Sequence, residues 1–216
     1  MIRILIESGP IVFFVVFFSL ILTISIHEFA HALMATRLGD QTPKSQGRLT
    51  LNPLAHLDPF GTLLLFLIGF GWGKPVFFSP YNLKNPRKDA AFISLAGPVS
   101  NLIFALLISI LYRIASIYLH PASIFLNIFF YIIYFNLLLA FFNLIPIHPL
   151  DGGKIFTGFL PASEANDANL FLKRYGLIIL ILLIFPIFSG VSPFFLVVSP
   201  LINFLLRILI PGNPLV

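Results

Sequence analysis

Residues 11–31 read IVFFVVFFSLILTISIHEFAH and set the interpretation of the whole chain. Up to residue 26 this run contains nothing more polar than serine and threonine, which is typical of a membrane-spanning helix. It then continues directly into His27, Glu28 and His31. Each charged group carried into hydrocarbon costs roughly 2.5–3.5 kcal/mol, so such side chains occur mainly where they have partners and a function.

The spacing of these three residues predicts a metal site. Positions i and i+4 of a helix face the same way, so His27 and His31 can hold one ion while Glu28 lies beside it, placed to act on water. A catalytic zinc site usually has three protein ligands, so a third must come from elsewhere in the chain. The best candidate is Asp151, which follows two prolines that break a helix and precedes two glycines that allow close backbone approach.

The composition is that of an integral membrane protein. Of 216 residues, 58% are hydrophobic and 10% are charged, and the mean hydropathy is +1.00. The net charge of +5 comes from lysines and arginines that gather between apolar segments, which indicates membrane topology and no nucleic-acid partner. The chain has no cysteine, which excludes disulfides, cysteine-type zinc sites and thiol catalysis.

The apolar pattern predicts an all-α integral membrane protein with about five transmembrane helices. The expected crossings are 10–36, 90–119, 123–148, 174–190 and 194–210. A shorter apolar stretch at 61–72 is expected to be re-entrant or interfacial. Glycines and prolines around 48–51 predict a small β-hairpin at the cytoplasmic face. We expect one domain over 1–216, with a core at 10–175 and a C-terminal helical pair at 174–210.

Basic residues predict the orientation of these helices. Ten lysines and arginines lie in segments 37–90 and 150–175, which share one face if there are five crossings, and that face is the cytoplasm by the positive-inside rule. The chain is therefore expected to be a multi-pass cell-membrane protein with its N-terminus outside. His27 lies about 15 Å of helix from Arg37, so the metal is expected inside the membrane toward the cytoplasmic face. A full crossing by 61–72 would put Asp151 on the wrong side.

Three motifs, taken in order, resemble the site-2 protease family of intramembrane zinc metalloproteases. They are HEFAH at 27–31, LAGPVSN at 95–101, and FNLIP at 142–146 running into LDGG at 150–153, and the resemblance covers about residues 10–175. It implies zinc, one ion per chain, held by His27, His31 and Asp151, with Glu28 as the catalytic base. It also implies a membrane-protein substrate with a transmembrane segment. Many relatives carry a PDZ or CBS domain, and this chain is expected to be a compact member with neither.

Other polar residues near these motifs are weaker candidates for the site. By the same resemblance, Asn143 would bind the backbone of an unwound substrate or support the oxyanion, although it can equally satisfy a backbone carbonyl freed beside Pro146. His148 can orient a ligand or stabilise an oxyanion, or be an interfacial histidine. His56 can belong to a pair with Asp58 that supports the site, or to a surface turn.

The predicted function is that of a zinc-dependent intramembrane endopeptidase, which cleaves a peptide bond in or near a transmembrane segment. One alternative is a membrane metal-binding or transport protein that uses the same ligands without hydrolysis. Glu28 argues against it, because a transporter has no special use for a base beside a three-ligand site. A second alternative, an inactive homologue that acts as a substrate chaperone, is disfavoured because every motif residue is present.

Overall fold

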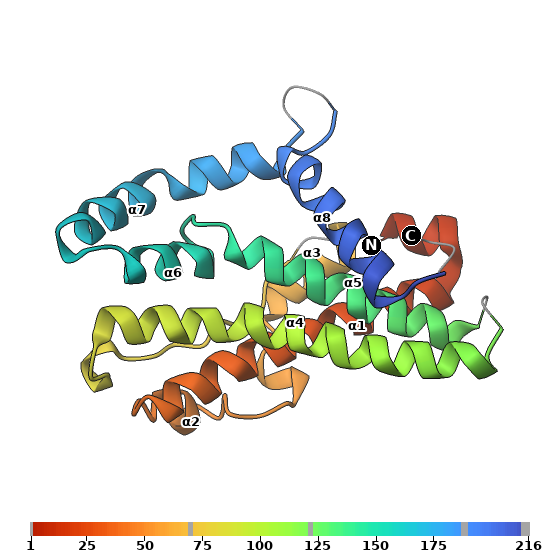
Figure 1. The fold of residues 1–216 in the computed structure, drawn as a ribbon, viewed down its shortest axis with the longest axis horizontal. Helices are drawn as coiled ribbons and strands as arrows, with labels where there is room; N and C mark the ends of the chain where they lie inside the picture. Colours follow the sequence, from red (N-terminus) through yellow and green to blue (C-terminus); the bar gives the residue numbers. More distant parts are fainter. Residues whose placement is uncertain (1, 69–70, 121–122, 187–189, 213–216) are drawn as a thin grey trace.

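Eight α-helices make up most of the chain in the computed structural model, which describes residues 2–68, 71–120, 123–186 and 190–212 (Figure 1). They are α1 (Ile2–Arg37), α2 (Thr42–Ser45), α3 (Pro59–Ile68), α4 (Pro86–Tyr118), α5 (Ile124–Leu144), α6 (Asp151–Phe159), α7 (Ala162–Ile184) and α8 (Pro193–Leu209). Two short 3-10 helices, η1 (Pro53–Ala55) and η2 (Pro80–Asn82), lie in the connections between α2 and α4. The fold is therefore all-helical over the described residues, as predicted.

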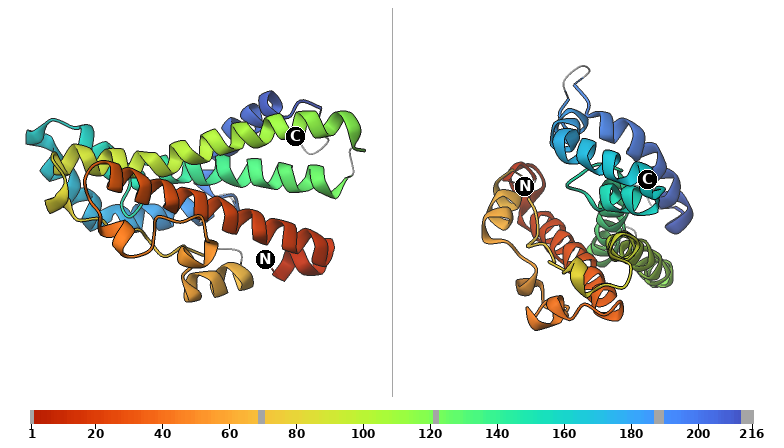
Figure 2. Two further views of the ribbon diagram at one scale, coloured as in Figure 1. Left: turned by 90° about the horizontal axis from the view of Figure 1, so that it is seen from below. Right: turned by 90° about the vertical axis from the view of Figure 1, so that its left-hand side faces the viewer.

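Helices α1, α4 and α5 form the long central part of the molecule and run alongside one another, α4 in the opposite direction to the other two (Figures 1 and 2). Among the described residues, three helices are long and apolar enough to cross a membrane: Gly9–Arg37 of α1, Pro86–Tyr118 and Ile124–Leu144. These are the first three predicted crossings. Their alternating directions bring the end of α1, the start of α4 and the end of α5 together at one end of the molecule.

Local sequence explains where these helices begin and end. Pro86 stands at the first position of α4, where the missing N–H is not needed, and the Asp89 carboxylate accepts a hydrogen bond of 2.8 Å from Asn85 N. α5 ends at Leu144, four residues earlier than predicted, because Pro146 cannot continue the helix. The segment 145–150 is therefore irregular, and it delivers Asp151 as the first residue of α6.

The main hydrophobic core lies between α4, α5 and α8, with residues such as Ala105, Ile133 and Ile202 almost fully buried. Arg113 of α4 ties α8 to this core. Its Nε donates to Leu209 O at 2.8 Å, and its guanidinium also donates to Ile208 O. Carbonyls in the last turn of a helix have no partner within the helix, so a cation from α4 satisfies and stabilises the end of α8.

Two expectations about the C-terminal half need refinement. α7 begins at Ala162, twelve residues before the predicted apolar segment. The charged stretch with Glu164, Asp167, Lys173 and Arg174 forms the first half of the same helix. α8 has 17 residues, fewer than a typical crossing requires. By length and composition, neither α7 nor α8 is a candidate membrane span. Only the three long helices of the described residues, α1, α4 and α5, meet these criteria.

The β-hairpin predicted around 48–51 is wrong. None of these residues lies in a strand; they form a bend and an extended connection leading to η1. Side chains take the backbone groups that a hairpin would pair: Arg48 is buried and donates to Ala55 O, and His56 Nε2 lies 2.7 Å from Thr50 O. Local side-chain bonds of this kind compete with strand pairing. The one isolated β-bridge found among the described residues joins Leu57 to Gly73.

The apolar stretch at 61–72 folds back toward its own start. α3 has ten residues, about 15 Å of helix, or half the thickness of a bilayer core. The segments before and after this helix contact each other. A Cβ added at Gly61 would lie only 2.2 Å from Trp72 O, and an isolated β-bridge joins Leu57 to Gly73. The extended segment 71–78 then runs beside α1 and brings its backbone to the predicted site.

Candidate metal centre

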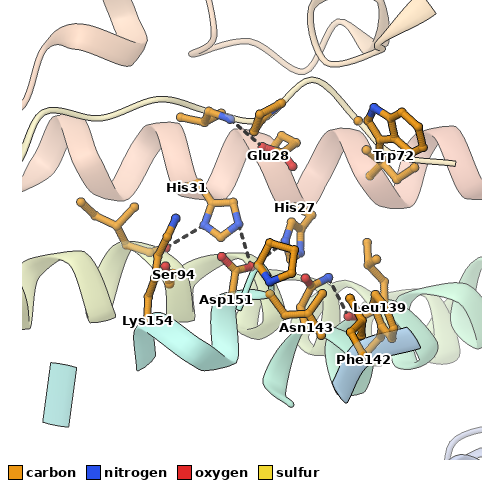
Figure 3. A pocket seen from close by; sticks show the side chains of 18 of the residues that line it. His27, Glu28, His31, Trp72, Ser94, Leu139, Phe142, Asn143, Asp151 and Lys154 are labelled. Atoms are coloured by element: carbon orange, nitrogen blue, oxygen red, sulfur yellow. Dashed lines mark hydrogen bonds and ion pairs between the residues drawn. The ribbon is translucent and has the colours of Figure 1, made fainter. Parts of the chain in front are cut away.

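Three predicted ligands from two distant parts of the sequence come together. His27 and His31 lie one turn apart on α1, and Asp151 is the first residue of α6 (Figure 3). His27 Nε2 and His31 Nε2 lie 3.1 and 3.2 Å from the same oxygen, Asp151 Oδ2. The three donor atoms lie within 4.8 Å of one another, and all three side chains are largely buried. The depth argument from the sequence is thus consistent with the observed arrangement.

The donor set fits a zinc ion. Two atoms bound to one tetrahedral zinc at about 2.0–2.1 Å lie roughly 3.3 Å apart, close to the observed N···O separations. Both imidazoles direct Nε2 toward the position that a metal ion would occupy, because their Nδ1 atoms are already hydrogen-bonded. His31 Nδ1 lies 2.7 Å from Ile93 O, and His27 Nδ1 lies 2.6 Å from Asn101 Oδ1. Such outer partners are a regular feature of histidine ligands.

Two asparagines near His27 were not recognised from the sequence as part of the site. Asn101 was interpretable only as a helix-packing residue of the LAGPVSN motif, yet it bonds His27 directly. Behind it lies Asn136 of α5, whose Oδ1 accepts from Asn101 Nδ2 at 2.7 Å. The available signal was an asparagine in the middle of an otherwise apolar helix, since polar groups at membrane depth need partners.

Glu28 stands beside the three donors without being one of them. Its Oε2 accepts a hydrogen bond of 3.1 Å from Val76 N, in the extended segment that passes over α1 (Figure 3). That segment is anchored on both sides of Val76, by Lys74 N donating to His56 O at 2.7 Å and by Ser79 N donating to Asp40 Oδ2 at 2.7 Å. The chain therefore fixes the Glu28 carboxylate through a backbone contact that no sequence motif specifies.

Asp40, which accepts the bond from Ser79 N, also bonds several other groups. It is fully buried, and its carboxylate also accepts bonds from Thr42 N, Thr42 Oγ1 and Asn82 Nδ2 at 3.0, 2.6 and 2.8 Å. Burial alone would raise the pKa of Asp40, but the hydrogen bonds from Asn82, Thr42 and Ser79 outweigh it and hold the pKa below the ordinary value. The charged carboxylate thus joins the turn after α1 to the segment that leads into η2.

A cavity of about 500 Å³ opens at the three donors. Its walls are mostly apolar and come from α1, the segment 71–78, α4, α5, α6 and α7. Besides the three donors, the polar side chains that line it are Glu28, Ser94, Asn143 and Lys154, the last with its Nζ 5.3 Å from the centroid of the Phe78 ring. A pocket of this size with few convergent polar groups can enclose a short piece of extended polypeptide.

The weaker candidates have different positions. Asn143 lines the cavity, and its Nδ2 donates to Leu139 O one turn earlier at 3.1 Å. His148 and His56 are not among the described residues that line it. His148 Nε2 lies 3.0 Å from Asn169 Oδ1, and burial, together with Lys154 and Lys173, keeps the pKa of His148 below its ordinary value despite that bond. His56 is fully buried, and its backbone carbonyl accepts the bond from Lys74 N of the segment 71–78.

Comparison with known proteins agrees with this geometry. The family description "Peptidase family M50" matches residues 13–186. YwhC of Bacillus subtilis, which is named as a zinc metalloprotease, is 42% identical over 179 residues, covering 80% of this chain and 81% of YwhC. Rip2 of Mycolicibacterium smegmatis, named likewise, is 32% identical over 184 residues, covering 81% of this chain and 68% of Rip2.

A further relative is the stage IV sporulation protein FB of B. subtilis, 30% identical over 164 residues, which cover 70% of this chain and 54% of that protein. No solved structure matches the chain. The family match covers well over half of the sequence, and it includes both histidines of α1 and the aspartate of α6. The chain therefore belongs to peptidase family M50, the site-2 protease family, and is a zinc metalloprotease of that family.

Proposed function

We propose that His27, His31 and Asp151 hold one zinc ion per chain, that Glu28 is the catalytic base, and that the substrate is a membrane protein cut in or near a transmembrane segment. The donor geometry and the apolar surroundings of the cavity support this assignment. A soluble peptide would gain little from a site enclosed by membrane-type helices, whereas an apolar segment already in the bilayer can reach it laterally.

The observation that carries the proposal is the position of Glu28. A carboxylate lies at the wall of the same cavity as the three donors but is bonded to a backbone N–H, which leaves it outside the ligand set. A general base must lie within reach of water at the reacting centre without being consumed as a ligand. A purely metal-binding or transport protein has no comparable need for this group.

The position of each residue suggests its role in the reaction. His27, His31 and Asp151 would hold the zinc ion, which would act as a Lewis acid on a carbonyl oxygen and would bring the pKa of water to about 7. Glu28 takes the proton from the attacking water and delivers it to the leaving amine. Asn143, at the cavity wall, is placed to bond the backbone of the unwound substrate or its oxyanion. His148 and His56 act indirectly, by fixing the segments on which Asp151 and the Glu28 partner lie.

We further infer the orientation of the chain in the membrane. The end of α1, the start of α4 and the end of α5 share one end of the molecule. Of the ten basic residues in segments 37–90 and 150–175, Arg37 is the last residue of α1, and the others lie in the connections that follow it or in α2, α4, α6 and α7. The positive-inside rule makes this the cytoplasmic face of the cell membrane. α3 is then re-entrant, α7 and α8 complete five crossings as a C-terminal pair, and residues 1–216 act as one metalloprotease domain.

The test is hydrolysis by the purified protein in liposomes that contain synthetic single-span peptides of varied sequence. We expect mass spectrometry to find products cut within or next to the span, lost on treatment with a zinc chelator and regained on adding zinc. A zinc-sensitive dye inside the same liposomes reports transport. Zinc entry without any peptide cleavage would contradict the proposal and favour the transporter.

A further inference from the structure

A chain of buried hydrogen bonds leads from His27 to the middle of α5. Asn101 and Asn136 both have no exposed surface, and Thr23 of α1 lies between them. A buried polar group costs free energy unless it is bonded, so two asparagines at one helix contact need a reason. Every amide nitrogen and oxygen of the pair has a partner, which makes the direction of each bond deducible.

The orientation of the Asn136 amide is fixed by a backbone carbonyl. Asn136 Nδ2 lies 2.8 Å from Ile132 O and 2.9 Å from Thr23 Oγ1. A carbonyl oxygen can only accept, so the NH₂ group must face Ile132 O. Asn136 Oδ1 therefore faces Asn101 as an acceptor.

The orientation of Asn101 follows from its neighbours. Its Nδ2 donates to Asn136 Oδ1 at 2.7 Å and to the backbone carbonyl of Thr23 at 3.2 Å. Because both of these atoms are acceptors, Asn101 Oδ1 is turned toward His27 Nδ1, 2.6 Å away, and can only accept. His27 must then carry its proton on Nδ1, which leaves the lone pair of Nε2 directed at the metal centre.

We propose that Asn136 is a positioning residue for the metal centre, acting through Asn101 to hold His27 in the tautomer and ring orientation that a metal requires. The inference rests on the proposed role of His27 as a metal ligand. His31 achieves the same state differently, because its Nδ1 donates straight to the Ile93 carbonyl. Only the His27 ligand therefore depends on a side-chain relay, and only that ligand is sensitive to substitutions on α5.

The first measurement is zinc affinity, by competition with a chromogenic chelator, for the full chain in detergent. Asn136→Leu keeps the branching of the side chain but cannot accept from Asn101, and we expect its zinc Kd to rise about tenfold. Asn101→Leu, which removes the direct partner, should raise it by about 10–100-fold. The neutral acid of Asn136→Asp keeps an oxygen acceptor toward Asn101 and an O–H donor toward Ile132 O, and its zinc Kd should remain within about twofold of the parent value.

Matched measurements separate positioning from general damage. Ser109→Ala removes another buried polar group of α4, one that bonds only Leu106 O of its own helix, and should leave the zinc Kd unchanged. Nitrogen-15 spectra of the histidine rings in metal-free protein should show His27 shifting toward a tautomer mixture in Asn136→Leu, while His31 stays as Nδ1–H. Because Asn136 acts through Asn101, the double variant should bind zinc no more weakly than Asn101→Leu alone.

Folded Asn136→Leu protein with the parental zinc Kd, or fold-changes that multiply in the double variant, would overturn the proposal. If Asn136→Leu does not fold, Thr23→Val takes its place. It removes only the hydroxyl acceptor of Asn136, and we expect the zinc Kd to rise by a few-fold, an unchanged value being the contrary result. Failure of the proposed function looks different, since the parent chain itself would then bind no zinc or cleave no peptide.

Discussion

Gly97 of α4 faces His31 of α1 so closely that a methyl group added at Gly97 would lie 2.5 Å from His31 Nε2. The same methyl group would lie 2.6 Å from His27 Cε1. Both contacts are shorter than carbon and nitrogen atoms tolerate, and the neighbours are ring atoms held at Nδ1 by Asn101 and Ile93. The positions of the two imidazoles therefore require glycine at this place in the LAGPVSN motif.

Gly97→Ala is expected to displace one or both imidazoles and to reduce zinc binding at least tenfold, because the rings cannot retreat without losing their Nδ1 partners. Zinc content after dialysis, measured by elemental analysis, checks this. Val99→Ala, at an exposed position two residues later in α4, serves as the control and should retain zinc. Full zinc occupancy in Gly97→Ala would show that α4 and α1 can separate at low cost.

Removal of each proposed ligand should lower the zinc content from about one ion per chain. His27→Ala is expected to lose the metal, and Asp151→Ala to lose most of it, since a catalytic site needs three protein ligands. Lys154→Gln lies on the same face of α6 one turn later and should keep its zinc. Asp151→Ala protein with one zinc per chain would remove the aspartate from the ligand set.

The buried Asp40 carboxylate should make stability depend on pH. Because the pKa of Asp40 in the folded protein is below its ordinary value of 3.8, the ionised group stabilises the fold above about pH 4, and this contribution is lost as the pH falls through the folded-state pKa. Asn at this position cannot accept from all of its donors, so Asp40→Asn should cost about 1–3 kcal/mol at pH 7.

Thermal unfolding in detergent at pH 7 and at pH 3 measures this effect. The difference in melting temperature between parent and Asp40→Asn should be large at pH 7 and should shrink at pH 3. Asp167→Asn, on the exposed side of α7, is the control and should differ little from the parent at either pH. A difference in melting temperature between the parent and Asp40→Asn that increases from pH 7 to pH 3 would contradict the assignment of charge to Asp40.

The proposed orientation can be tested with single cysteines, since the parent chain has none. Cysteines at Ser45, Lys84 and Asn166, all exposed, should react with an impermeant reagent from the cytoplasmic side, and one at Ser123 from the other side. Labelling of positions 45 and 84 from opposite sides would mean that residues 61–72 cross the bilayer, and the shared face proposed for the basic segments would be wrong.

The sequence predicted that His27, His31 and Asp151 lie together, because the patterns around these residues obey local rules. A four-residue spacing puts His27 and His31 on one helix face, and prolines before Asp151 end α5 and allow a new helix to begin at Asp151. Apolar length identified the three long helices. Each of these inferences needs only periodicity, helix rise and the cost of burying charge.

What the sequence did not reveal depends on contacts between distant segments. The bonds from Val76 N to Glu28, from Ser79 N to Asp40, and along the Asn136–Asn101–His27 relay join residues 35 to 74 positions apart along the chain, and no local pattern encodes them. The prediction of a hairpin at 48–51 was wrong for a similar reason. The buried side chains of Arg48 and His56 bond the carbonyls of Ala55 and Thr50 in that loop. The early start of α7 was missed because its first turns are charged.

The most direct test of the central claim, that this chain is a protease with Glu28 as its base, is to measure zinc content and peptide cleavage together in Glu28→Gln. Glutamine keeps the size and the acceptor oxygen for Val76 N but cannot take a proton, and loss of a general base typically costs on the order of 10²–10⁴ in rate. We predict parental zinc content with cleavage reduced by that factor. Loss of zinc in Glu28→Gln would make Glu28 a ligand, and full cleavage with zinc retained would show that another group is the base.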